Sequence, residues 1–249
     1  MHSHTGVRLI NTAICGRMYY TDWGVLMKKF VFVLILTVAL LQTGIISANS
    51  EHISDWAKDE VNEAISLGFI PEKLQNNYNE NITREEFVTV AVEYMSYQFD
   101  MSVEEMADRC KSTDDYFSDI EGSEFADYIR LAKRLGIIKG DGDGTFRPRS
   151  QITREEAVVI LADVFVRYSP GWKMGYYDFS QFNDLDKMSH WAWGAFRMVY
   201  WLGVMNGVSD SEFAPKELCT REQCYVTFMR LCKNGNVSRY YGHNIHFAL

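Results

Sequence analysis

The sequence predicts a mainly α-helical protein made of three helix–loop–helix repeats that share one core. The tripeptide Thr-Arg-Glu recurs at Thr83, Thr153 and Thr220, at intervals of 70 and 67 residues. A Leu-Gly pair precedes each copy, and the leucine lies 16 to 18 residues before the threonine. After each copy, apolar residues recur at i, i+4, i+7 and i+8, which indicates a helix with one buried face. Each unit is near the small end for an independent core, so we expect the three to share one.

Each Thr-Arg-Glu copy carries the signals of a helix start. Threonine is a good N-cap, and Glu156, three residues after Thr153, completes a capping box. The arginine after each threonine stands at the first helical position, beside the positive end of the helix dipole. These arginines are Arg84, Arg154 and Arg221. Guanidinium, dipole and free backbone N–H groups would converge on one point, which suits an anion.

A glycine-rich turn precedes the second copy. Glycine takes positive φ at little steric cost, so this turn can bend tightly and let a ligand approach the backbone closely. We expect the ligand to contact Gly140, Asp141, Gly142, Asp143, Gly144 and Thr145. The turn faintly resembles a calcium loop, but no carboxylate occupies the twelfth position. The sequence therefore predicts no metal site and no cofactor.

Together these motifs resemble the S-layer homology domain, the cell-surface anchoring module of bacteria. The second unit has Phe117-Ser-Asp, Leu135-Gly-Ile, the glycine-rich turn and Ile152-Thr-Arg-Glu. The third unit has His190-Trp-Ala, Leu202-Gly-Val and Thr220-Arg-Glu. The first unit has Asp55-Trp-Ala and Ile82-Thr-Arg-Glu but lacks the glycine-rich turn, so it departs most from the family pattern.

The resemblance implies a fold and a function. The three helices after the Thr-Arg-Glu copies would meet in a shared central three-helix bundle, with clefts between adjacent units. The protein would bind, without a covalent bond, an anionic and pyruvylated secondary cell-wall polysaccharide linked to peptidoglycan. It would be secreted and associated with the cell wall and the S-layer. Arg84, Arg154 and Arg221 would clamp the carboxylate of the pyruvate ketal.

Alternatives stay open for these residues and for the function. The arginines could instead form salt bridges with carboxylates of a neighbouring unit. Trp191 could contact the sugar or pack within the protein. The chain could also be a surface-assembly module that interacts with other surface proteins and has lost polymer binding.

The start of the chain indicates export. Residues 1–26 show no usable pattern, whereas Met27-Lys-Lys, an apolar run over residues 30–41 and the small Ala48 are typical of a secretory signal peptide. We expect translation to begin at Met27 and cleavage to leave no membrane segment; an uncleaved anchor is the alternative. The predicted segments are an extension (1–26), a signal peptide (27–48), repeat 1 (51–98), an acidic connector (99–116), repeat 2 (117–168), an aromatic connector (169–181), repeat 3 (182–234) and a tail (235–249).

Charge and composition exclude other classes. The chain has a net charge of −8, which becomes −11 without residues 1–48, so neither nucleic acid nor an anionic membrane surface is an expected partner. An anionic polymer would need local cations at contact distance, where screening leaves their attraction intact. No nucleophile triad, metal cluster or phosphate-binding loop is present, and first-turn positions explain Glu85, Glu155 and Glu222. We therefore predict no enzyme.

Two cysteines occupy a structural position in the third unit. Cys219 precedes the N-cap Thr220 and Cys224 lies at the fourth helical position, the pair that touches in a hydrophobic staple. An exported protein can keep a disulfide, so a Cys219–Cys224 bond is possible here. The alternative is two small apolar thiols in contact.

Overall fold

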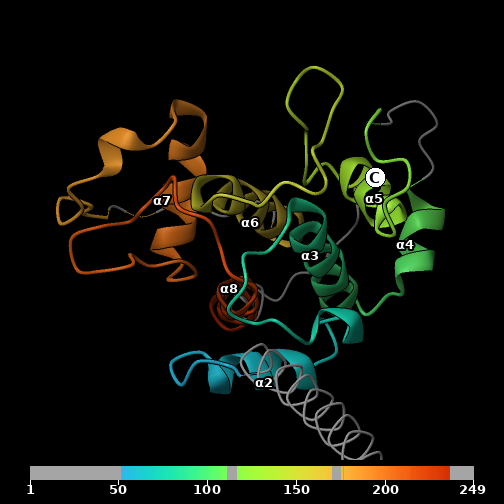
Figure 1. Cartoon of the computed structure of the whole chain (residues 1–249), viewed down its shortest axis with the longest axis horizontal. Coiled ribbons are helices and arrows are strands. Elements are labelled where there is room, and N and C mark those ends of the chain that lie inside the picture. Colours follow the sequence, from blue (N-terminus) through green and yellow to red (C-terminus); the bar gives the residue numbers. More distant parts are fainter. Residues whose placement is uncertain (1–51, 111–116, 170–174, 176, 236–249) are drawn as a thin grey trace, which may run out of the picture. The chain divides into compact units, whose positions relative to one another are not determined.

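The computed structural model describes residues 52–110, 117–169, 175 and 177–235, all within one compact unit (Figure 1). The α-helices are α2 (Lys58–Ser66), α3 (Arg84–Phe99), α4 (Val103–Arg109), α5 (Ala126–Arg134), α6 (Arg154–Tyr168), α7 (Trp193–Trp201) and α8 (Arg221–Asn234). Short 3-10 turns are η1 (Glu72–Leu74), η2 (Leu185–Lys187) and η3 (His190–Ala192). The mainly helical fold class is confirmed. The predicted extension and signal peptide lie outside the described residues, and within these residues no helix is both long and apolar enough to cross a bilayer.

The three helix starts form as the sequence predicts. Helices α3, α6 and α8 begin directly after Thr83, Thr153 and Thr220. Each threonine hydroxyl accepts the N3 backbone N–H, and the N3 side chain accepts the N–H of the threonine. These capping boxes satisfy two of the N–H groups that a helix start would otherwise leave unpaired.

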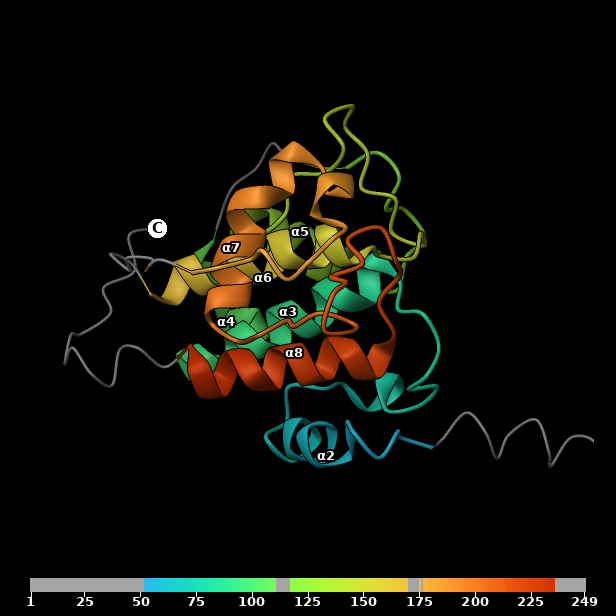
Figure 2. The same ribbon diagram turned by 90° about the vertical axis from the view of Figure 1, so that its left-hand side faces the viewer.

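The repeats are interlocked, because each first helix packs on the second helix of the preceding unit. Helix α5 packs on α3, α7 packs on α6, and α2 of the first unit closes the cycle by packing on α8 of the third (Figures 1 and 2). Pairs of charged residues extend the closing contact: Arg230 on α8 donates two hydrogen bonds of 3.0 Å to Glu60 on α2. The repeat is therefore a unit of sequence and not a separately packed body.

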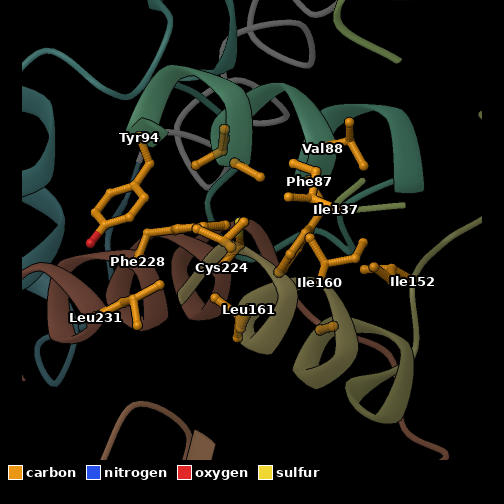
Figure 3. Close-up of a cluster of buried hydrophobic side chains, with 14 of the residues drawn as sticks. Phe87, Val88, Tyr94, Ile137, Ile152, Ile160, Leu161, Cys224, Phe228 and Leu231 are labelled. Carbon is orange, nitrogen blue, oxygen red and sulfur yellow. The ribbon is translucent and has the colours of Figure 1, made fainter. Parts of the chain in front are cut away.

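Helices α3, α6 and α8 lie at the centre of this cycle, and each contacts the other two. Figure 3 shows Phe87, Leu161 and Phe228, one from each helix, pointing into the space between them. All three side chains are fully buried. The shared bundle that the family resemblance implies stays a prediction, which these pairwise contacts favour.

A ring of backbone hydrogen bonds joins the three loops just before the helix starts. Ile82 N donates to Cys219 O (2.9 Å), Cys219 N donates to Ile152 O (3.0 Å), and Ile152 N donates to Ile82 O (3.1 Å). Isolated antiparallel bridges accompany the ring at the adjoining positions. Because the ring is closed, the N-terminal ends of the three central helices are fixed beside one another.

The disulfide considered between Cys219 and Cys224 is not formed, and both residues are free and buried. They occupy the staple positions as small apolar groups, as Ile82 and Phe87 do in the first unit. Burial raises the pKa of Cys219 to about 11 and that of Cys224 further above its ordinary value. Both thiols are therefore protonated at neutral pH and shielded from oxidants.

The two buried thiols are expected to react with Ellman's reagent at least about a hundredfold more slowly in the folded protein than after unfolding in urea, because the thiolate is the nucleophile. The half-buried Cys110 serves as an internal reference and should react first. Alkylation followed by peptide mass spectrometry assigns each site. If the two cysteines are not labelled even after unfolding, and are labelled only once a reductant is added, they form a disulfide instead.

Candidate functional site

The N-terminal N–H groups of the central helices are already bonded to protein. Arg84 N donates to Ser150 O (2.8 Å) and Glu85 N donates to Pro148 O (3.0 Å). The first two N–H groups of α6 donate to carbonyls of the loop before α8, and those of α8 donate to carbonyls of the loop before α3. The prediction that these N–H groups converge on an anion is therefore wrong, because the following repeat supplies their acceptors.

Each arginine at the first helical position also reaches into the following unit. Arg84 Nε donates to Phe146 O at 2.8 Å, and Arg154 Nε donates to Phe213 O at 2.9 Å. Both guanidinium groups lie 4.8 Å from the ring centroid of that phenylalanine, within cation–π range. Arg154 therefore does not meet the glycine-rich turn that precedes its own helix. That turn lies beside Arg84, which corrects the expected pairing.

The three arginines differ in their counter-ions. Arg84 Nη1 lies 2.9 Å from Glu156 Oε1, and Arg221 Nη2 lies 2.5 Å from Glu86 Oε1. For these two arginines the salt-bridge alternative is confirmed. Additional carboxylates stand near both: Asp141 is 3.8 Å from Arg84, and Glu80 is 3.7 Å from Arg221.

Arg154 has no such partner. Within the described residues, no carboxylate lies at ion-pair distance from its guanidinium, although the residue is only 4% exposed. Its Nη2 donates to Asn206 O at 2.6 Å, while no described residue accepts a hydrogen bond from Nη1. Burial lowers the pKa of Arg154, yet an arginine stays protonated at neutral pH. Asp184 and Glu217 attract this buried charge from beyond ion-pair distance, so a ligand carboxylate in contact with Arg154 would add a closer counter-ion.

The glycine-rich turn is held mainly by its own residues. Gly140, Gly142 and Gly144 have positive φ, as predicted. A side chain at Gly140 would overlap the Phe117 ring, so this close approach is to protein and not to a ligand. Asp143 accepts from Thr145 N (2.9 Å) and Thr145 Oγ1 (2.7 Å), which lowers its pKa.

Two hollows lie between units, each beside one of these arginines. The hollow beside Arg154 has a volume of about 400 Å³ and is lined by Trp56, residues 205–208 and the first turns of α8. The hollow beside Arg84 has a volume of about 450 Å³ and is lined by Gly140, Asp141 and Trp191 among others. Each hollow combines residues of all three units, and its tryptophan is largely exposed, 54% for Trp56 and 58% for Trp191.

Trp191 is thus placed with Arg84, while the tryptophan near Arg154 is Trp56. Trp56 was not predicted from the sequence as a site residue, although both tryptophans lie at the same distance before their Leu-Gly pairs. At that position the second unit has Glu124, which lies 3.3 Å from Lys73. Lys73 also lies 3.9 Å from the Phe125 ring centroid. In the third region between units, this ion pair therefore occupies the position that a tryptophan occupies in the other two regions.

A comparison with known protein families identifies the repeats. The family model of the S-layer homology domain matches residues 116–158 and 181–223. These segments are S-layer homology domains. The first repeat lies outside the matched segments, but it has the same capping box and the same contacts with its neighbours. The resemblance stated from the sequence is confirmed for the second and third repeats, and it indicates a secreted protein of the S-layer and cell surface.

Relatives come from several kinds of surface protein. The chain is 26% identical over 220 residues to a surface-layer 125 kDa protein of Lysinibacillus sphaericus, covering 83% of this chain and 17% of that protein. It is 34% identical over 118 residues to a cellulosome-anchoring protein of Acetivibrio thermocellus, covering 44% and 23%. It is 29% identical over 187 residues to an amylopullulanase of Thermoanaerobacterium thermosulfurigenes, covering 74% and 9%.

The chain therefore spans only a small part of these S-layer homology relatives. The family and the anchoring relatives support cell-surface anchoring by a module that is not itself catalytic. The enzyme among them shares less than a tenth of its length with this chain.

Proposed function

We propose that this protein anchors to the cell wall by binding an anionic, pyruvylated secondary cell-wall polysaccharide in the hollow beside Arg154. The observation that carries the proposal is the buried guanidinium of Arg154 at the edge of a hollow, with no carboxylate of the described residues at ion-pair distance. A carboxylate in this hollow would supply the missing counter-ion and accept from Nη1. Charge-assisted hydrogen bonds of this kind are stronger than neutral ones, particularly where water is excluded.

The rest of the hollow suits a sugar. Trp56 is largely exposed and lines the same hollow as Arg154, together with residues 205–208. An aromatic ring gives apolar contact area for the carbon face of a saccharide, while the arginine holds its acid group. The net charge of −8 opposes an anionic ligand at long range. At physiological salt the Debye length is about 8 Å, so the contact with Arg154 decides the affinity.

Replacing Arg154 with glutamine is expected to reduce retention on purified cell walls by at least about tenfold, because the ligand loses its charged donor. Arg109→Gln removes the same charge from the exposed end of α4 and is the matched control. The measurement is co-sedimentation of the purified protein with walls before and after chemical removal of pyruvate ketals.

Removal of pyruvate ketals from the walls should lower the retention of wild type to the level of the Arg154 variant. The Arg109 variant should be retained on untreated walls as wild type is. Circular dichroism of the Arg154 variant establishes that it is folded. Retention that depends on neither pyruvate nor Arg154 would overturn the proposal. It would then favour the alternative of a surface module that binds another protein.

A further inference from the structure

The glutamate at N3 of the capping box performs two tasks in the first two repeats. One oxygen of Glu156 accepts the Thr153 N–H at 2.9 Å, and the other accepts from Arg84 Nη1 at 2.9 Å. In the first repeat, one oxygen of Glu86 likewise accepts the N–H of its N-cap threonine and the other pairs with Arg221. One carboxylate thereby caps its own helix and neutralises the arginine of the preceding unit.

The third repeat has glutamine at this position. Gln223 Oε1 accepts the Thr220 N–H at 3.3 Å, so the capping box is kept. The remaining polar atom of the side chain is the amide nitrogen, which is a donor and cannot pair with a guanidinium. Arg154 and Gln223 both line the same hollow. A single change from carboxylate to amide therefore leaves Arg154 without the partner that the other two arginines have.

Two further positions that line the hollows have a carboxylate in the second repeat and none in the third. Around the Arg84 hollow, Asp141 and Asp163 contribute carboxylates in addition to Glu156. The residues at the corresponding positions of the third repeat, counted from the buried phenylalanine and from the helix start, are Val208 and Arg230. An anion entering the Arg84 hollow would have to displace Glu156 and would compete with Asp141 and Asp163, which pair with the other cations of this hollow, Arg147 and Lys139. In the Arg154 hollow, the lining carboxylate of Glu222 accepts from Ser54, and Arg230 pairs with Glu60, so no carboxylate there pairs with Arg154. Competition between carboxylates for the same cations disfavours an anionic ligand.

We propose that the N3 residue of each capping box determines which arginine accepts an anion, and that Gln223 makes the Arg154 hollow the anion site of this chain. This inference rests on the proposed function and deepens it. Glu156 and Glu86 serve as internal counter-ions, so Arg84 and Arg221 take no ligand carboxylate. The three repeats share the same capping box, but the third differs from the other two in this specificity-determining residue, and the chain carries one anionic sugar per molecule.

The test is Gln223→Glu in the full chain. Glutamate keeps the capping box, as Glu156 shows, and places a carboxylate where it can pair with Arg154. Affinity for purified cell walls is expected to fall at least about tenfold, because the ligand and the introduced carboxylate compete for one guanidinium. Gln151→Glu is the matched control: it adds the same charge at an exposed residue that accepts from Asn81 and lines neither hollow.

Isothermal titration with a methyl glycoside that carries a pyruvate ketal provides the second measurement. Wild type is expected to bind one molecule per chain, and thermal unfolding should show Gln223→Glu to be at least as stable as Gln151→Glu, because the introduced carboxylate can pair with the buried Arg154. Two or three equivalents bound, or normal wall binding by Gln223→Glu, would overturn this inference while the proposed function stands. If wild type itself does not bind cell walls, the proposed function is wrong.

Discussion

Replacing Phe228 with alanine is expected to lower the free energy of unfolding by about 3–5 kcal/mol, the largest effect we expect from any single core substitution. Phe228 is fully buried on α8, and its ring centroid lies 5.4 Å from those of Phe87 and Tyr94 on α3. Alanine would leave a cavity at the contact between the third unit and the first. The surrounding helices are held by the backbone ring and the capping boxes, so they can relax only in part.

Equilibrium unfolding in urea, followed by circular dichroism, measures this loss. Val166→Ala is the control, because Val166 lies on α6 but is 47% exposed, and its truncation should change stability by less than about 1 kcal/mol. Because the units interlock, we expect one cooperative transition in both variants. A loss below about 1 kcal/mol at Phe228, or a separate transition for the third unit, would contradict the interlocked packing described above.

Features set by neighbouring residues in the chain could be predicted from the sequence. The start of α6 depends on Thr153 and on Glu156 three residues later, and both signals lie within one turn. The positive φ values of the glycine-rich turn are likewise local. The mainly helical class followed from apolar periodicity, because a helix with one buried face repeats its apolar residues at a fixed spacing.

Contacts between units were harder to predict, because nothing in a local pattern says which neighbour a side chain meets. Arg154 and the turn at 140–145 are close in sequence, which suggested a common site. In the structure, Arg154 instead bonds Phe213, 59 residues further along the chain. A contact within one unit can be equally hidden: Gly140 has no room for a side chain because Phe117, which precedes the first helix of the same unit, lies against it.

Gln223 shows a different limit. Its departure from glutamate is visible in the sequence, but glutamine preserves the capping box, so the local pattern alone does not reveal its effect. Its consequence for charge appears only when Glu156 is seen to bind Arg84 of another unit. Trp56 was similarly visible as the counterpart of Trp191, but its place beside Arg154 follows from the closure of the third unit on the first.

Replacing Glu155 with alanine is expected to destabilise the fold by about 2–4 kcal/mol, because it removes a buried carboxylate that joins two units. Glu155 is 4% exposed and accepts from Ser189 N (2.9 Å), Ser189 Oγ (3.0 Å) and Lys216 Nζ (2.6 Å). Ser189 immediately precedes η3 and leads into α7, so this contact fixes where the first helix of the third unit begins.

The same connection recurs around the cycle, which explains why a glutamate follows each arginine. Glu85 accepts from Ser123 in the second unit, and Glu222 accepts from Ser54 N (3.0 Å) in the first. Alanine at Glu155 would leave the partly buried Ser189 N–H without its acceptor and would leave Lys216 Nζ with only Ser189 Oγ. Glu124→Ala is the control, since Glu124 forms an exposed pair with Lys73 that should contribute less than about 1 kcal/mol. Urea unfolding of both variants decides; equal small losses would mean that the helices hold the units together without these glutamates.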